Sequence, residues 1–163
     1  MTDDDLRTRA EIEALCVEFW YRVDHQNGQG VADLFTEDGV YSVATGRNAG
    51  RAAIMESYVK RAARGPRLSR HAHSNLRLTI ESPSRARGVS MLTLWARDGE
   101  APLKLTLPVS VTDVQDEYVK EADGLWRIVH RHLTQAFLGD EPGVLPFGPN
   151  TPLNPDEPDK GER

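Results

Sequence analysis

The chain has 163 residues, of which 20 are basic and 25 acidic, so its formal net charge is −5 at pH 7. This length predicts one domain with a substantial core, and the acidic balance, without a basic stripe interleaved with aromatic residues, argues against nucleic acid as a partner. The single cysteine, Cys16, excludes an internal disulfide, and we find neither a signal-peptide pattern nor a membrane-length apolar run, so we expect a cytoplasmic protein without membrane contact.

The first predicted element is a long helix that begins after Thr2 and ends at Asn27-Gly28. Three aspartates follow Thr2, which is typical of a helix N-terminus. Apolar residues then recur at helical spacing: Ile12, Leu15, Cys16, Phe19, Trp20 and Val23. Asp24 continues the edge of this apolar face.

Short elements follow in the first half of the chain. We expect a short helix at residues 31–35, a strand at 40–43 and a loop at 46–50. A further helix is predicted over residues 51–64. Its buried face is expected to comprise Ile54, Met55, Tyr58 and Ala62.

The second half of the chain changes to the alternating pattern of strands. Strands are predicted around residues 76–80, at 89–95, from 105 to 120 and from 125 to 137. Asp123-Gly124 is a strong hairpin turn between the last two.

Helices come first and consecutive strands afterwards, an order that predicts an α+β fold with the helices packed on one face of a largely antiparallel sheet. A strongly curved sheet that is closed by the N-terminal helix leaves a pocket, where ligands usually bind. We expect residues 1–138 to form a single domain of this kind. Residues 139–163, rich in proline and charge, are predicted to be a tail with little structure of its own.

Asp24 and the segment Arg70-His71-Ala72-His73-Ser74-Asn75 are the candidates for chemistry. A carboxylate and an imidazole supplied by different elements can act as a general acid–base pair if they meet in one cavity. The competing interpretation of Asp24 is a solvated carboxylate near a helix end.

The two histidines lie two residues apart, so a strand places His71, His73, Asn75 and Arg77 on one face, opposite Leu76 and its aliphatic neighbours. This polar row faces either a polar cavity or water, and a bulge would change which histidine points inward.

A second histidine pair, His130 and His132, is expected on the face of Trp126 and Ile128, from which one of them could reach the cavity. Zinc bound by His-x-His with Asp24 or with this second pair is the less favoured alternative, and we predict no metal site.

Several segments, in their order and spacing, carry a resemblance to a known family: Val23-Asp24, residues 34–41, Gly50-Arg51, Arg70-His71-x-x-Ser74-Asn75 and residues 123–128. From about Leu6 to Phe137 the chain resembles the SnoaL-like branch of the nuclear transport factor 2 superfamily. Within that superfamily it looks closest to scytalone dehydratase and hexachlorocyclohexane dehydrochlorinase. The resemblance implies a cone-shaped α+β barrel and a cofactor-free His/Asp dyad in its pocket.

The resemblance also implies site residues. Asp24 matches the dyad aspartate and His71 the dyad histidine, so these two are the predicted catalytic residues. Tyr21 and Tyr41 are candidates for the tyrosines that activate the substrate carbonyl in scytalone dehydratase. Trp20, Tyr58 and His73 complete the predicted substrate-binding set. Phe19 stands where the dehydrochlorinase has a lysine, which argues against that particular reaction.

We therefore expect a cofactor-independent lyase or isomerase, dehydratase-like or cyclase-like, that acts on a hydrophobic and cyclic small molecule. The alternative is a non-catalytic binding module or accessory subunit, like the small subunits of ring-hydroxylating dioxygenases, because the fold alone does not choose a reaction. The outward face of the sheet also carries apolar residues, among them Val89, Met91 and Trp95 or their alternates, which predicts a homo-oligomer, a dimer or a trimer.

Overall fold

Six strands form one mixed, open sheet in the order β2-β1-β6-β5-β4-β3. The computed structural model describes residues 2–44 and 46–139. The elements are α1 (Asp3–His25), the 3-10 helix η1 (Val31–Leu34), β1 (Phe35–Val43), β2 (Gly46–Ala49), α2 (Arg51–Ala62), β3 (Arg67–Ser82), β4 (Arg85–Asp98), β5 (Ser110–Lys120) and β6 (Trp126–Leu138). All of the predicted tail except Gly139 lies outside the described residues.

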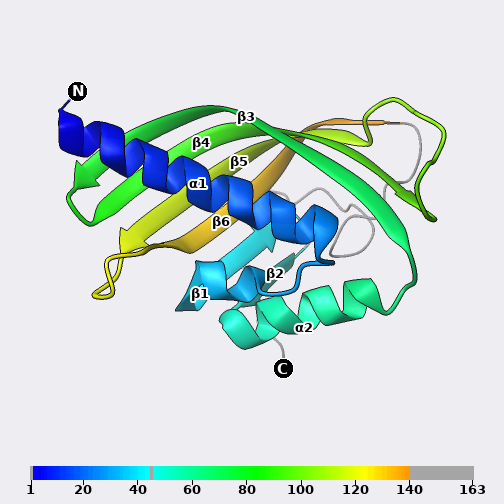
Figure 1. Cartoon of the computed structure of the whole chain (residues 1–163), viewed down its shortest axis with the longest axis horizontal. Coiled ribbons are helices and arrows are strands. Elements are labelled where there is room, and N and C mark those ends of the chain that lie inside the picture. Colours follow the sequence, from blue (N-terminus) through cyan, green and yellow to red (C-terminus); the bar gives the residue numbers. More distant parts are fainter. Residues whose placement is uncertain (1, 45, 140–163) are drawn as a thin grey trace.

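The sheet is antiparallel except at one pair of strands, because β1 runs parallel to β6. Figure 1 shows α1 lying over the curved sheet, with α2 beside β1 and β2 at one end. The helices and the concave side of the sheet therefore enclose the core. This arrangement confirms the predicted α+β class, with N-terminal helices on a curved and largely antiparallel sheet.

The first helix begins and ends as the sequence predicts. The Thr2 hydroxyl accepts a hydrogen bond from the Asp5 backbone, and the Asp5 carboxylate accepts one from the Thr2 backbone, which together form a capping box. All six predicted apolar residues of this helix are buried against the sheet. The helix stops before Asn27 and Gly28, both of which have positive φ.

Gly28 fixes how closely the end of α1 approaches α2. A Cβ atom at this position would lie 2.1 Å from the Tyr58 ring, and φ here is +80°. Only glycine satisfies both conditions. The contact places Tyr58, which is buried, beside the end of the helix that carries Asp24.

Several element boundaries differ from the predictions. Residues 46–49 form the edge strand β2, and β1 already begins at Phe35. Met55 is 59% exposed, so only Ile54 and Tyr58 of α2 are buried. The strand predicted from residue 105 begins at Ser110 instead, because Pro108 has no N–H to donate to a ladder.

A β-bulge in β3 overturns the predicted polar row. The register with β4 shifts between Ser74 and Arg77, and Asn75 adopts a left-handed conformation with φ +57°. The extra residue turns Leu76 to the same concave face as His71 and His73, instead of the opposite one. The two histidines therefore share the interior with the aliphatic side chains that follow them.

Candidate active site

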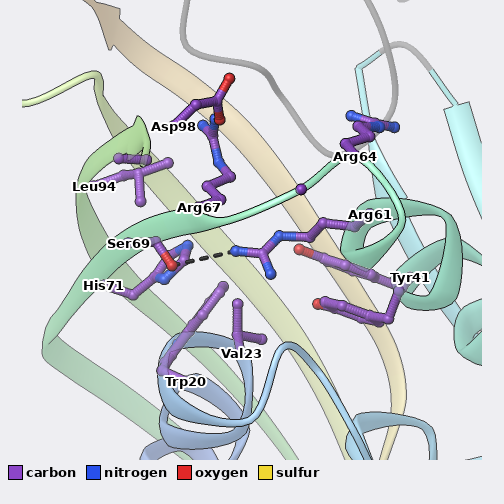
Figure 2. Close-up of a pocket in the computed structure, with 13 residues that line it drawn as sticks. Trp20, Val23, Tyr41, Arg61, Arg64, Arg67, Ser69, His71, Leu94 and Asp98 are labelled. Atoms are coloured by element: carbon purple, nitrogen blue, oxygen red, sulfur yellow. Dashed lines mark hydrogen bonds and ion pairs between the residues drawn. The ribbon is translucent and has the colours of Figure 1, made fainter. Parts of the chain in front are cut away.

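A pocket opens between the C-terminal half of α1, the end of α2 and the first part of β3 (Figure 2). Its volume is about 70 Å³. The lining is largely apolar, with a cluster of three arginines at the mouth. The lining residues are Trp20, Val23, Tyr41, Tyr58, Arg61, Arg64, Gly65, Arg67, Ser69, His71, Leu94, Ala96 and Asp98.

Asp24 and His71, predicted from the sequence as a pair, are in direct contact. Nδ1 of His71 lies 2.6 Å from Oδ1 of Asp24, and the backbone N–H of His71 donates to Oδ2 at 2.8 Å. Their side chains are 7% and 10% exposed for Asp24 and His71, respectively. The strand thus presents both its backbone and its side chain to one carboxylate on the helix.

Ser69 adds a third hydrogen bond to Asp24, since its hydroxyl donates to Oδ1 at 2.7 Å. Burial opposes ionisation of Asp24, but the hydrogen bonds and the charge of His71, together with Ser69, hold the pKa of this carboxyl below its usual value. Asp24 is therefore an ionised acceptor at neutral pH.

An ionised carboxylate can only accept, so Nδ1 of His71 carries the proton of their hydrogen bond. In the neutral ring, Nε2 is then the unprotonated nitrogen, and it has no hydrogen-bond partner among the described residues. The Trp20 ring stacks on His71, with ring centroids 4.5 Å apart and planes at 18°. His71, held by Asp24 and Trp20, can accept a proton inside the pocket.

Two tyrosines form the opposite wall. Tyr41 and Tyr58 are buried and hydrogen-bonded to each other. Burial raises the pKa of Tyr41 to about 12 and raises that of Tyr58 well above its usual value. Both hydroxyls therefore stay protonated at neutral pH, and since one proton is used in the hydrogen bond between them, the pair is a neutral, hydrogen-bonded unit at this wall of the pocket.

The other predicted substrate-binding residues divide into two groups. Trp20, Tyr41 and Tyr58 line the pocket. Tyr21 is 50% exposed and lies against His25, away from the pocket lining. His73 points into the concave side further along β3, where Nε2 and the Ser90 hydroxyl share a hydrogen bond of 2.7 Å, and it does not line this pocket.

A buried ion pair that was not predicted from the sequence joins β6 to β5. Nε and Nη2 of Arg131 donate to the two Asp116 oxygens at 2.8 and 2.7 Å, and both side chains are buried. The guanidinium also lies 4.2 Å from the Phe19 ring centroid. Nη1 of Arg131 and Nε1 of Trp20 are buried donors that find no partner among the described residues.

A bulge in β6 explains why Arg131 was not predicted to face the interior. The register of β5 and β6 shifts at Val129, so Arg131 turns inward while His130 and His132 turn outward, the opposite of the expectation. The available signal was Asp116, which occupies an inward position of β5 between Val114 and Tyr118. A carboxylate at such a position requires a buried cation.

His130 and His132 lie on the outer face of the sheet, where both rings contact the Ser42 hydroxyl at 2.9 and 2.8 Å. Within residues 2–44 and 46–139, no three His, Cys, Asp or Glu side chains are grouped so that they could hold a metal ion. His71 and His73, which share a face, bind Asp24 and Ser90 instead of a common centre.

Residues 4–132 match the family model of the SnoaL-like domain. No curated protein matches the chain. In the described part of the chain, no helix combines the length and apolar character that a membrane span requires.

Solved structures with the same fold include a protein from Novosphingobium aromaticivorans provisionally named scytalone dehydratase. It is 25% identical, with a TM-score of 0.74, over 86% of this chain and 92% of that one. A Mycobacterium tuberculosis protein of unknown function is 28% identical, with a TM-score of 0.71, over 83% and 76%. LinA, at 20% identity and a TM-score of 0.67 over 90% and 97%, shares the fold.

Proposed function

The chain belongs to the SnoaL-like domain family, and we propose that it is a cofactor-independent lyase or isomerase in which Asp24 and His71 form the acid–base dyad. The observation that carries this proposal is the 2.6 Å contact between the two side chains at the wall of a largely apolar pocket. A protein that only binds a ligand has no need for a base that is both oriented and charge-stabilised at that wall.

In the proposed reaction, Nε2 of His71 removes a proton from a carbon beside a carbonyl group or beside a carbon that bears a leaving group. Asp24 stays ionised and stabilises the imidazolium as it forms. In a dehydration, the electron pair of the C–H bond forms the new C=C bond, hydroxide departs from the neighbouring carbon, and the imidazolium proton completes the water. In an isomerisation, the same proton returns to a different carbon.

The substrate class follows from the lining. Trp20, Val23 and Leu94 offer apolar and planar surface, while the hydrogen-bonded pair of Tyr41 and Tyr58 contributes a neutral hydroxyl donor for a developing enolate oxygen. We propose a hydrophobic, cyclic small molecule that carries a carbonyl group. No step of the reaction requires a cofactor.

Turnover of dyad variants tests the proposal. A thermal-shift screen of cyclic ketones and hydroxyketones selects ligands, and proton NMR in D2O follows deuterium exchange and loss of water for each hit. Loss of a general base costs about 10²–10⁴-fold in rate. We expect a loss of that size in kcat for His71→Ala, and a severe loss for Asp24→Asn, which keeps the volume but not the charge.

His73→Ala is the matched control, and we expect a milder effect because His73 bonds Ser90 outside the pocket. Full activity in His71→Ala, or a larger loss in His73→Ala, would show that the wrong histidine has been assigned. Ligands that bind wild type and His71→Ala equally, with no exchange or turnover in either, would favour the binding-module alternative.

A further inference from the structure

The mouth of the pocket is basic although the chain as a whole is acidic. Arg61, Arg64 and Arg67 all line it, whereas the chain carries a net charge of −5. Figure 2 shows that the Arg61 side chain extends inward from the end of α2, between Ser69 and Tyr41. This local excess of cations is therefore a feature of the pocket and not of the overall composition.

Only part of this positive charge is balanced by the acidic residues nearby. Arg67 donates to Asp98 at 2.8 Å. Asp24, the other carboxylate near the pocket, accepts hydrogen bonds from His71 and Ser69. Among the described residues, no carboxylate forms an ion pair with Arg61.

Among the described residues, the Arg61 side chain makes a single hydrogen bond, from Nη2 to the Ser69 hydroxyl at 3.2 Å. That hydroxyl already directs its own proton to Asp24. Nε and Nη1 of Arg61 bond to no described residue, although the side chain is partly buried and burial lowers its pKa from the usual value. A guanidinium in such a place retains unused donors that face the pocket.

We propose that Arg61 binds a carboxylate of the substrate, so that the ligand is a cyclic molecule with an acidic group at the pocket mouth and its reacting carbon at His71. This inference rests on the proposed function, since it assigns the substrate class of the same pocket. The planar fork of arginine matches a carboxylate with two parallel hydrogen bonds, and its attraction is strengthened where water is partly excluded.

The other two arginines have different roles. Arg67 is held by Asp98 and forms part of the wall. Arg64 is exposed and lies at the rim, where its charge is screened by solvent and contributes to attraction at a distance. Arg64 is therefore a matched control for Arg61, because it carries the same charge at the same pocket mouth but its side chain is exposed at the rim.

The test compares two fragments of the same shape, benzoate and benzamide, by ligand-detected NMR titration in the absence of turnover. A hydrogen bond to a charged group is worth about 1.5–3 kcal/mol, roughly 10- to 100-fold in affinity. We expect wild type to prefer benzoate by at least ~10-fold, Arg61→Gln to lose that preference through weaker benzoate binding, and Arg64→Gln to keep it. Arg61→Lys, which retains the charge without the fork, should keep part of the preference and provides a second variant if the glutamine variant is unstable.

Three outcomes would overturn the inference: no saturable benzoate binding in the millimolar range, equal binding of both fragments to wild type, or the same loss in Arg64→Gln as in Arg61→Gln. His71→Ala should bind both fragments with the wild-type preference. Failure of the Arg61 test leaves the dyad assignment untouched, because that assignment depends on turnover. Conversely, the benzoate preference could depend on Arg61 while His71→Ala keeps full turnover. That result would refute the proposed reaction but not the carboxylate site.

Discussion

His73 lies on the same face of β3 as His71, but it is surrounded by different groups. Burial, and then the positive charge of Arg131, lower the pKa of His73 below its usual 6.5, and its ring bonds the neutral Ser90 hydroxyl. His73 therefore stays neutral at pH 7 beside a neutral hydroxyl, whereas the ring of His71 hydrogen-bonds the carboxylate of Asp24.

This difference predicts a decline of stability in weak acid. The unfolded chain binds a proton at His73 near pH 6.5, but the folded chain does so only at a lower pH, so the free energy of unfolding falls as the pH drops between these two values. The slope for one such proton is at most ~1.4 kcal/mol per pH unit. Urea unfolding from pH 7.5 to 5 should show a shallower decline for His73→Gln than for wild type.

His132 contributes in the same direction, because burial and then His130 lower its pKa as well. His132→Gln should therefore remove a further part of the slope, and the double variant more than either single one. A steeper decline in His73→Gln than in wild type would contradict this account.

The ion pair of Arg131 and Asp116 joins β6 to β5 directly beneath α1. The Tyr118 hydroxyl donates to Asp116 at 2.6 Å and lies 3.2 Å from Cys16 Sγ on the helix, so one network connects the sheet with the helix that carries Asp24. Its members are buried, and a charge left without its partner there is expensive.

Removal of one partner should therefore cost far more than removal of both. Asp116→Asn leaves the Arg131 charge unpaired, and we expect it to lower the free energy of unfolding in urea by about 3–5 kcal/mol at pH 7. The double variant Arg131→Met with Asp116→Leu should recover much of that loss, because it removes both charges and keeps apolar volume.

The exposed helix pair of Glu56 and Lys60 provides the comparison, and Glu56→Gln should leave the free energy of unfolding nearly unchanged because solvent screens this pair. If Asp116→Asn is as mild as Glu56→Gln, or if the double variant is less stable than the single one, the pair does not hold these elements together.

At the scale of elements, what could be predicted from the sequence was the part determined by local pattern. The α1 boundaries follow from Thr2 and from Asn27-Gly28, and the last hairpin follows from Asp123-Gly124. The contact of Asp24 with His71 could be anticipated because each residue lies at a recognisable place on its element and because the resemblance pairs them.

Most of the unpredicted features arise from one extra residue in a strand or from long-range pairing. Bulges at Asn75 and Val129 invert which side chains face inward, and neither produces a signal in the alternation of the sequence. Because of the bulge at Val129, Arg131 faces the interior, whereas strict alternation had predicted that His130 and His132 would. The parallel pairing of β1 with β6 depends on long-range packing, which local pattern does not contain.

For the molecule as a whole, the curved sheet has a concave face and an outer face that differ in what they carry. The concave face holds the core, the pocket and the buried ion pair. The outer face carries a shallow groove with arginines and a glutamate on neighbouring strands, lined by Arg77, Thr79, Arg87, Val89, Gln115, Glu117, His130 and His132. Neither helix covers this face in Figure 1.

The outer face leads to the last prediction, that the chain associates with a second copy of itself through this surface. Val89 is 47% exposed, and Met91 and Trp95 follow it outward along β4. Apolar side chains bordered by charges of both signs suit a self-complementary contact between identical faces. Light scattering after gel filtration at micromolar concentration should give the mass of a dimer, and Val89→Glu should shift it toward the monomer. Val59→Glu, at a similarly exposed valine on α2, should leave the mass unchanged. A monomeric wild type, or an equal effect of both substitutions, would assign these apolar residues to the surface of a monomer.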